Sequence, residues 1–203
     1  MLIFLASFII FIIWLTYELK KHRKMEENAL NDFWAREHEA NLTRKKPLDN
    51  LTFVQIPFAY IPQSLLSDND TVRECLDILN ALSDKKLVNF TGISNTDLKL
   101  QYGTANLPLL SEYDENYTLF ARTLYRLADA YYQNGYESNA RILLEKAVES
   151  GTDIKGNYKL LADIYQKHGE TDKIKALLDS ASSLRTSCKK SIIRSLEEYV
   201  REH

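Results

Sequence analysis

Apolar positions in the C-terminal part of the chain recur at a spacing of 34 residues. Nine residues of the first copy are identical to the residues 34 positions later. These pairs are Leu127 and Leu161, Ala128 and Ala162, Asp129 and Asp163, Tyr131 and Tyr165, Gly135 and Gly169, Leu143 and Leu177, Leu144 and Leu178, Ala147 and Ala181, and Thr152 and Thr186. Composition alone would give roughly two identities over one such stretch, so the chain contains an internal repeat. A repeat of this length predicts stacked helical hairpins.

Each copy contains two apolar stripes with helical spacing. In the first copy, the stripes are Leu124, Leu127, Ala128 and Tyr131, then Ala140, Leu143, Leu144 and Ala147. In the second copy, they are Tyr158, Leu161, Ala162 and Tyr165, then Ile174, Leu177, Leu178 and Ala181. Residues with this spacing share one face of a helix, so each stripe predicts an amphipathic helix whose apolar face lies in the core. Gly135 and Gly169 separate the stripes, and glycine readily adopts the left-handed conformation that ends a helix.

The two copies, 121–154 and 155–188, also share an order of residue types. The first reads Leu124-x2-Leu127-Ala128-x2-Tyr131, Gly135 and Ala140-x3-Leu144-x2-Ala147, and the second reads Tyr158-x2-Leu161-Ala162-x2-Tyr165, Gly169 and Ile174-x3-Leu178-x2-Ala181. This order resembles the tetratricopeptide repeat (TPR) family, whose pattern is W-x2-L-G-x2-Y, then A-x3-F, then P. The resemblance implies an α-solenoid that binds a protein partner on the inner face formed by the first helix of each repeat.

Two repeats are fewer than the roughly three that a solenoid usually needs for stability, so other segments must cover its ends. Residues 188–202 have a charged face and an opposite apolar face, which consists of Ile192, Ile193, Leu196, Tyr199 and Val200. This pattern predicts a C-terminal capping helix. We therefore expect residues 116–203 to contain the TPR-like repeats and the capping helix.

The segment 47–69 has a different character from the repeats. Pro57 and Pro62 exclude a regular helix, yet the segment is too apolar for a free linker. It is either an extended, strand-like segment packed on the helical domain or an internal peptide in or beside the repeat groove. Residues 70–115 are expected to form a helical packing region that begins with an amphipathic helix over 70–87.

The first 19 residues are strongly apolar, and Glu18 is the first charged side chain. A helix of this length reaches about 28 Å, close to the roughly 30 Å thickness of the hydrocarbon core of a membrane. Because no Lys or Arg precedes the apolar run and no small-residue cleavage site follows it, the pattern favours an uncleaved transmembrane signal anchor over a secretory signal peptide. The expected fold class is therefore all-α, with an N-terminal transmembrane helix (1–19), a TPR-like α-solenoid and a C-terminal capping helix.

Residues 20–46 are expected to contain a basic, then charged juxtamembrane helix. Its helical pattern covers 18–43, and Arg44-Lys45-Lys46-Pro47 ends it. The basic cluster predicted to lie at the membrane surface consists of Lys20, Lys21, Arg23 and Lys24. By the positive-inside rule, this cluster predicts a single-pass protein of the cell membrane with a cytoplasmic C-terminal domain. The helix lacks the sustained heptads of a coiled coil, so the sequence offers little support for a homo-oligomer.

Charge and cysteine content exclude several classes of protein. The formal net charge is −2, and without Glu18 and the four clustered basic residues there remain 22 basic and 27 acidic residues, a net charge of −5. This balance argues against a nucleic-acid-binding protein. Cys75 and Cys188 are too few for a disulfide framework and too far apart in the chain for a metal-binding pair.

The sequence contains no recognisable catalytic motif. HExxH, CxxC, G-x-S-x-G and a Gly-rich phosphate loop are all absent. Asp129 and Asp163 occupy equivalent positions one repeat apart, but no candidate acid, base or metal ligand accompanies them. We therefore expect no enzymatic activity, no cofactor and no metal ion.

By resemblance to TPR domains, the candidate partner-binding residues lie on the inner face and are Arg122, Tyr125, Asp129, Tyr132, Gln133, Lys159, Asp163, Gln166 and Lys167. Tyr125 and Tyr132 beside Arg122 are typical of an aromatic and cationic hot spot, while an ordinary solvated helix face is the alternative interpretation. Some TPR domains hold a C-terminal carboxylate with a Lys and an Asn on the first inner helix. This chain has Tyr125 and Asp129 there, so we do not expect acidic tails as ligands at that position.

The combined features favour a membrane-anchored cytoplasmic scaffold or adaptor that is not catalytic and binds a protein or peptide partner. One alternative reverses the topology and gives an extracytoplasmic envelope-assembly or quality-control factor. A second alternative is a structural membrane protein that self-assembles through residues 18–43.

Overall fold

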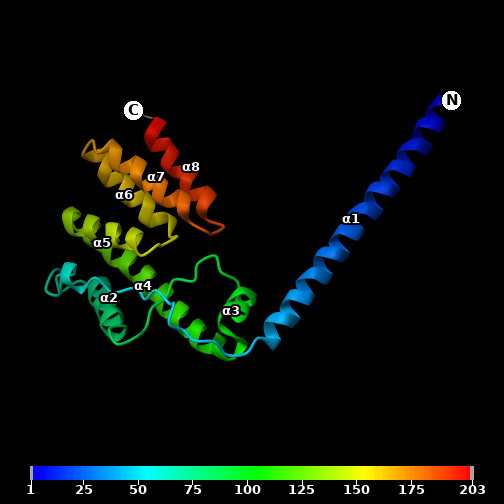
Figure 1. The fold of residues 1–203 in the computed structure, drawn as a ribbon. Helices are drawn as coiled ribbons and strands as arrows, with labels where there is room; N and C mark the ends of the chain where they lie inside the picture. Colours follow the sequence, from blue (N-terminus) through cyan, green and yellow to red (C-terminus); the bar gives the residue numbers. More distant parts are fainter. Residues whose placement is uncertain (1, 202–203) are drawn as a thin grey trace. The chain divides into compact units, whose positions relative to one another are not determined.

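The computed structural model describes residues 2–201, with side chains for residue 4 and residues 7–201. Residue 1 of the predicted anchor and residues 202–203 of the predicted repeat region lie outside the described residues. Between residues 2 and 201 the chain forms eight α-helices and two short 3-10 helices, without a β-strand (Figure 1). The fold is therefore all-α, as the helical periodicities predict.

The chain divides into two compact units. The first unit contains α1 (Leu2–Leu42), α3 (Asn95–Tyr102) and η2 (Thr104–Asn106). Within it, the C-terminal part of α1 packs against α3, and Glu37 forms an ion pair with Lys99. Residues 95–106 therefore belong with α1 in space, although the sequence groups them with the packing region of the repeats.

The long helix α1 ends at Leu42, within one residue of the end that the sequence predicts for the helix over 18–43. Arg44, Lys45, Lys46 and Pro47 follow it outside the helix. The backbone N–H of Lys46 donates a hydrogen bond of 2.9 Å to the carbonyl of Tyr102, so the chain after α1 pairs with the end of α3.

The prediction of a transmembrane anchor over 1–19 is wrong for the residues that the structure describes. None of the helices between residues 2 and 201 combines enough length with enough apolar character to cross a membrane. In α1, the charged residues Glu18, Lys20 and Lys21 follow directly on the apolar residues.

The predictions that depend on the anchor are corrected with it. These are the signal anchor, the transmembrane part of the fold class and the single-pass location in the cell membrane with a cytoplasmic C-terminal domain. The basic residues Lys20, Lys21, Arg23 and Lys24 are exposed on α1. Without a membrane span beside them, they no longer determine an orientation.

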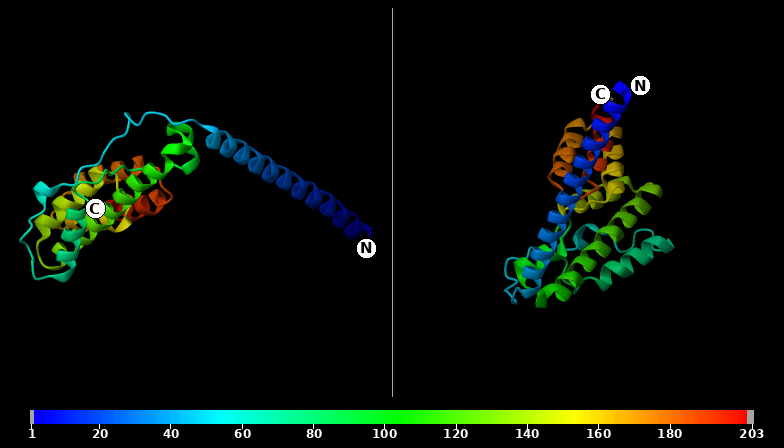
Figure 2. Two further views of the ribbon diagram at one scale, coloured as in Figure 1. Left: turned by 90° about the horizontal axis from the view of Figure 1, so that it is seen from below. Right: turned by 90° about the vertical axis from the view of Figure 1, so that its right-hand side faces the viewer.

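The second unit is a stack of antiparallel helices. Its helices are α2 (Asp70–Ala81), α4 (Leu107–Gln133), α5 (Glu137–Glu149), α6 (Lys155–Lys167), α7 (Thr171–Ser183) and α8 (Lys189–Arg201). Each helix packs on the next along the chain, and α8 packs on both α6 and α7 (Figures 1 and 2). The predicted capping helix over 188–202 is therefore present as α8, within one residue at each end.

The two apolar stripes of each copy form the core of this stack. In the first copy all eight stripe residues are buried, and in the second copy all are buried except Leu178, which is half-buried. Gly135 and Gly169 adopt φ values of +83° and +70° at the turns between the stripes. The local pattern of apolar and glycine positions therefore predicts the helices and their buried faces correctly.

The segment 47–69 packs on the second unit without forming a strand, and its one regular element is η1 (Phe58–Tyr60). Leu51 and Ile61 are buried, and the backbone N–H of Val54 donates to the carbonyl of Leu87 at 2.9 Å. The hydroxyl of the buried Tyr131 donates to the carbonyl of Pro62 at 3.3 Å. Of the two interpretations of this segment, the structure favours a packed structural segment, since its apolar side chains extend the core.

Candidate binding groove

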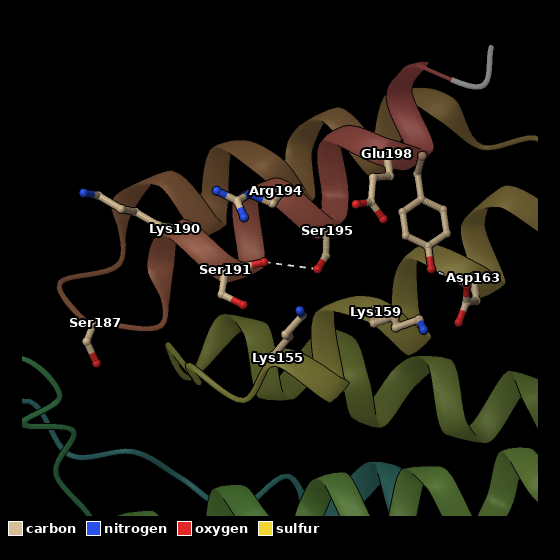
Figure 3. Close-up of a pocket in the computed structure, with 10 residues that line it drawn as sticks. Lys155, Lys159, Asp163, Ser187, Lys190, Ser191, Arg194, Ser195 and Glu198 are labelled. Carbon is tan, nitrogen blue, oxygen red and sulfur yellow. Dashed lines mark hydrogen bonds between the residues drawn. The ribbon is translucent and has the colours of Figure 1, made fainter.

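A polar groove of about 860 Å³ lies between α6 and α8 of the second unit (Figure 3). Its lining comes from one face of each helix and from the turn before α8. The lining residues are Lys155, Lys159, Asp163, Ser187, Lys190, Ser191, Arg194, Ser195, Glu198 and Tyr199. We refer to this feature as the α6–α8 groove.

Helical periodicity places the α6 residues on one wall. Lys155, Lys159 and Asp163 follow one another at intervals of four, so they share one face of the helix. Tyr158 and Leu161 occupy other faces and are buried. The same amphipathic pattern that buries the repeat stripe therefore presents two lysines and a carboxylate to the groove.

The wall on α8 is built in the same way. Lys190, Arg194 and Glu198 are spaced by four residues, while Ile192 and Leu196 are buried on a different face of the same helix. Figure 3 shows the side chain of Lys155 pointing from α6 toward α8, with the polar face of α8 opposite. Burial of the apolar face of the capping helix thus directs its polar face across the groove to α6.

The four basic side chains of the groove have no carboxylate partner in the part of the chain that the structure describes. Every basic residue of α5 and α7 has a carboxylate oxygen within 4 Å: Arg141 with Glu145 and Glu170, Lys146 with Glu149, Lys173 with Glu170, and Lys175 with Asp172. Among the described residues, Lys155, Lys159, Lys190 and Arg194 form no such pair. The neighbouring helices neutralise their cations internally, whereas the groove keeps its positive charge available to a ligand.

The charges of the groove are separated along its length. The hydroxyl of Tyr199 donates a hydrogen bond to the carboxylate of Asp163, so the C-terminal halves of α6 and α8 meet at one end. Glu198 lies at the same end, and the ammonium of Lys159 points toward it, so two carboxylates and one lysine meet there. Lys155 and Lys190 come from the first turns of the two helices, so both helix N-termini, with their partial positive charge, lie at the other end.

Of the predicted partner-binding residues, Lys159 and Asp163 line this groove. Tyr125 instead packs between α4 and α6: a Cβ added to Gly156 would lie 2.5 Å from the Tyr125 hydroxyl oxygen. This partial burial, together with the nearby Asp129 carboxylate, raises the pKa of the Tyr125 phenol. The tyrosine is therefore part of a helix contact.

The remaining predicted residues lie elsewhere on the second unit. Arg122 and Gln133 are exposed on α4, and Gln133 donates to Asp129 at 3.3 Å. Tyr132 and Gln166 are half-buried, and Lys167 pairs with Glu137 at 2.5 Å, which raises the pKa of the lysine. Tyr125, Asp129 and Gln133 line a smaller pocket of about 320 Å³, together with Asn69 and Thr71. The structure therefore divides part of the predicted set between this pocket and the α6–α8 groove and does not gather the set into one site.

The sequence contained a signal for the groove residues that the prediction omitted. Lys190, Arg194 and Glu198 recur at i, i+4 and i+8 on the capping helix, which the sequence analysis evaluated only for its apolar face. Lys155 likewise precedes Lys159 by one turn. What the sequence does not show is that these two polar faces oppose each other.

The groove carries donors and charges but no recognisable catalytic constellation. Its carboxylates are Asp163, which accepts the Tyr199 hydroxyl, and Glu198. In the described part of the chain, no group of three or more His, Cys, Asp or Glu side chains is placed to hold a metal ion. Asp129 and Asp163, the equivalent carboxylates of the two repeats, line different pockets. The arrangement is suited to holding an anionic ligand.

Comparisons with protein-family models, with curated proteins and with solved structures gave no match to this chain.

Proposed function

We propose that this protein is a non-catalytic, TPR-type scaffold that holds a segment of a partner protein in the α6–α8 groove. The resemblance of the two repeats to TPR sequences supports a protein-binding role, because such stacks expose extended inner faces. The observation that carries the proposal is a group of four basic side chains on α6 and α8 that line one groove and have no carboxylate partner between residues 7 and 201.

Site-specific photo-crosslinking tests this function. A photo-crosslinking amino acid replaces Ser191, which lines the groove, or Ser182, an exposed serine of α7 outside it. We expect Ser191 to yield a discrete crosslinked partner that mass spectrometry identifies, and Ser182 to yield none. The charge reversal Lys190→Glu/Arg194→Glu should reduce that crosslink at least tenfold, because it replaces two attractive charges with repulsive ones.

Three results would contradict the proposal. The first is the same product from both positions, and the second is no product from Ser191. The third is a product that consists of two copies of this chain, which would favour self-assembly over a scaffold for another protein.

A further inference from the structure

We propose that the ligand of the α6–α8 groove is an extended peptide segment that carries a phosphorylated side chain and, two to four residues away, a basic side chain. This inference rests on the proposed function and names the chemistry of its partner segment. It follows from the charges at the two ends of the groove and from their separation.

The basic end of the groove is suited to a phosphoryl group. Lys155 points into this end from α6, Lys190 and Arg194 line it from α8, and none has a carboxylate partner within the described chain. The hydroxyls of Ser187 and Ser191 line the same region. A dianion with three acceptor oxygens can accept charge-assisted hydrogen bonds from several of these donors at once, whereas a side-chain carboxylate brings one charge and two oxygens.

The acidic end of the groove selects a positive charge. Glu198 has no basic partner among the described residues, and Asp163 accepts a hydrogen bond from Tyr199, so the two carboxylates outnumber the single lysine, Lys159, at this end. Along α8, Glu198 follows Arg194 by about 6 Å and Lys190 by about 12 Å at 1.5 Å per residue. An extended peptide advances about 3.3 Å per residue, so a basic side chain two to four positions from the phosphorylated one reaches this end.

The same two carboxylates argue against other anionic ligands. A nucleic-acid strand carries a phosphate at every nucleotide, so one lying along the groove would bring negative charge onto Asp163 and Glu198. A membrane surface presents many anionic headgroups and would meet the same repulsion. A segment with a single phosphorylated residue and a basic residue places opposite charges at both ends of the groove.

A peptide library is the probe that tests the proposal. The full chain is immobilised and exposed to peptides with one fixed phosphoserine, one fixed Arg two, three or four positions before or after it, and random residues elsewhere. Matched libraries replace the phosphoserine with Ser, or the Arg with Glu. We expect the phosphoserine and Arg library to be retained at least tenfold more than either matched library.

Three variants locate the binding within the groove. Lys190→Glu/Arg194→Glu should abolish the preference for phosphoserine over Ser. Glu198→Lys should retain the phosphoserine preference but change the second preference from Arg to Glu, a gain that a misfolded protein could not show. Lys175→Glu reverses an exposed charge on α7 outside the groove and should leave both preferences unchanged.

Specific outcomes overturn the inference. It fails if phosphoserine and Ser libraries are retained equally, or if the double charge reversal leaves the preference intact. It also fails if a single-stranded oligonucleotide or phosphatidylserine vesicles bind with the same sensitivity to Lys190→Glu/Arg194→Glu. In the crosslinking experiment, a partner that Ser191 captures equally before and after phosphatase treatment would refute the phosphorylated ligand while leaving the scaffold function standing.

Discussion

At the scale of single residues, the second unit depends on a few side chains that satisfy backbone groups far along the chain. Asn89 is the clearest example. Its amide nitrogen donates to the Tyr117 hydroxyl at 2.9 Å and to the carbonyls of Ser150 and Gly151 at 3.1 and 3.0 Å. One half-buried amide therefore attaches the segment before α3 to α4 and to the turn after α5, and the Tyr117 hydroxyl also donates to the Ser150 carbonyl at 3.1 Å.

The substitution Asn89→Ala should lower the free energy of unfolding by about 1–3 kcal/mol, since it leaves the Gly151 carbonyl without its side-chain donor and the Ser150 carbonyl with only the Tyr117 hydroxyl. The two tryptophans, Trp14 and Trp34, lie in α1, so urea-induced unfolding of the second unit is followed by circular dichroism. Asn134→Ala is the control, because that exposed amide bonds only the carbonyl of its own helix. Equal destabilisation by the two variants would contradict this role for Asn89.

At the scale of elements, the turn inside each hairpin depends on a glycine. Gly135 and Gly169 lie in the left-handed region, and a Cβ added at either position would meet no atom within 4 Å. The only cost of a side chain there is the backbone conformation itself, because the space around each glycine is open. This makes the two turns a clean measure of backbone strain in the repeats.

Gly169→Ala should lower the free energy of unfolding by about 1 kcal/mol, and Gly169→Asn should lower it less, because asparagine tolerates the left-handed conformation better than alanine. The same order is expected at Gly135. Thermal unfolding followed by circular dichroism measures both pairs. If the asparagine variants were as destabilised as the alanine variants, the left-handed backbone conformation would not explain the loss of stability.

At the scale of the molecule, one cluster of charges ties the two hairpins of the second unit together. Arg141 of α5 pairs with Glu170, which precedes α7, through two hydrogen bonds of 2.8 Å. The guanidinium also lies 5.1 Å from the ring centroid of Tyr165 in α6. The hydrogen bonds from Arg141, with a further contribution from Lys173, lower the pKa of Glu170 to about 2.

This pKa shift predicts that the stability of the second unit depends on pH. Because the folded state lowers the pKa of Glu170, the ionised carboxylate contributes stability above its unfolded pKa, which is about 4.5, and that contribution is lost as the pH falls toward about 2. Glu170→Gln should therefore be less stable than the parent at pH 6, and its stability should fall less between pH 6 and pH 3.

Urea unfolding at the two pH values, followed by circular dichroism, measures this difference. Glu149→Gln is the control, because Glu149 is 62% exposed and pairs only with Lys146 of its own helix. A pH dependence that Glu170→Gln leaves unchanged would assign the acid sensitivity to other carboxylates.

The sequence by itself determined the helices of the second unit and their buried faces, because apolar spacing and turn glycines act within a few residues of each other. It also determined the capping helix, whose apolar face is as regular as those of the repeats. It also predicted the end of the long helix to within one residue of Leu42, but it wrongly predicted a membrane span at the N-terminus.

Only the tertiary structure decided where the candidate site lies. Tyr125 looks like a ligand-binding tyrosine in sequence, but Gly156 of the next repeat leaves the space that its ring occupies. The groove exists because α8 packs on α6 and α7 and brings Lys190 and Arg194 opposite Lys155. Local periodicity determines which face of a helix is polar, but the surface that this face meets depends on contacts between residues far apart in the chain.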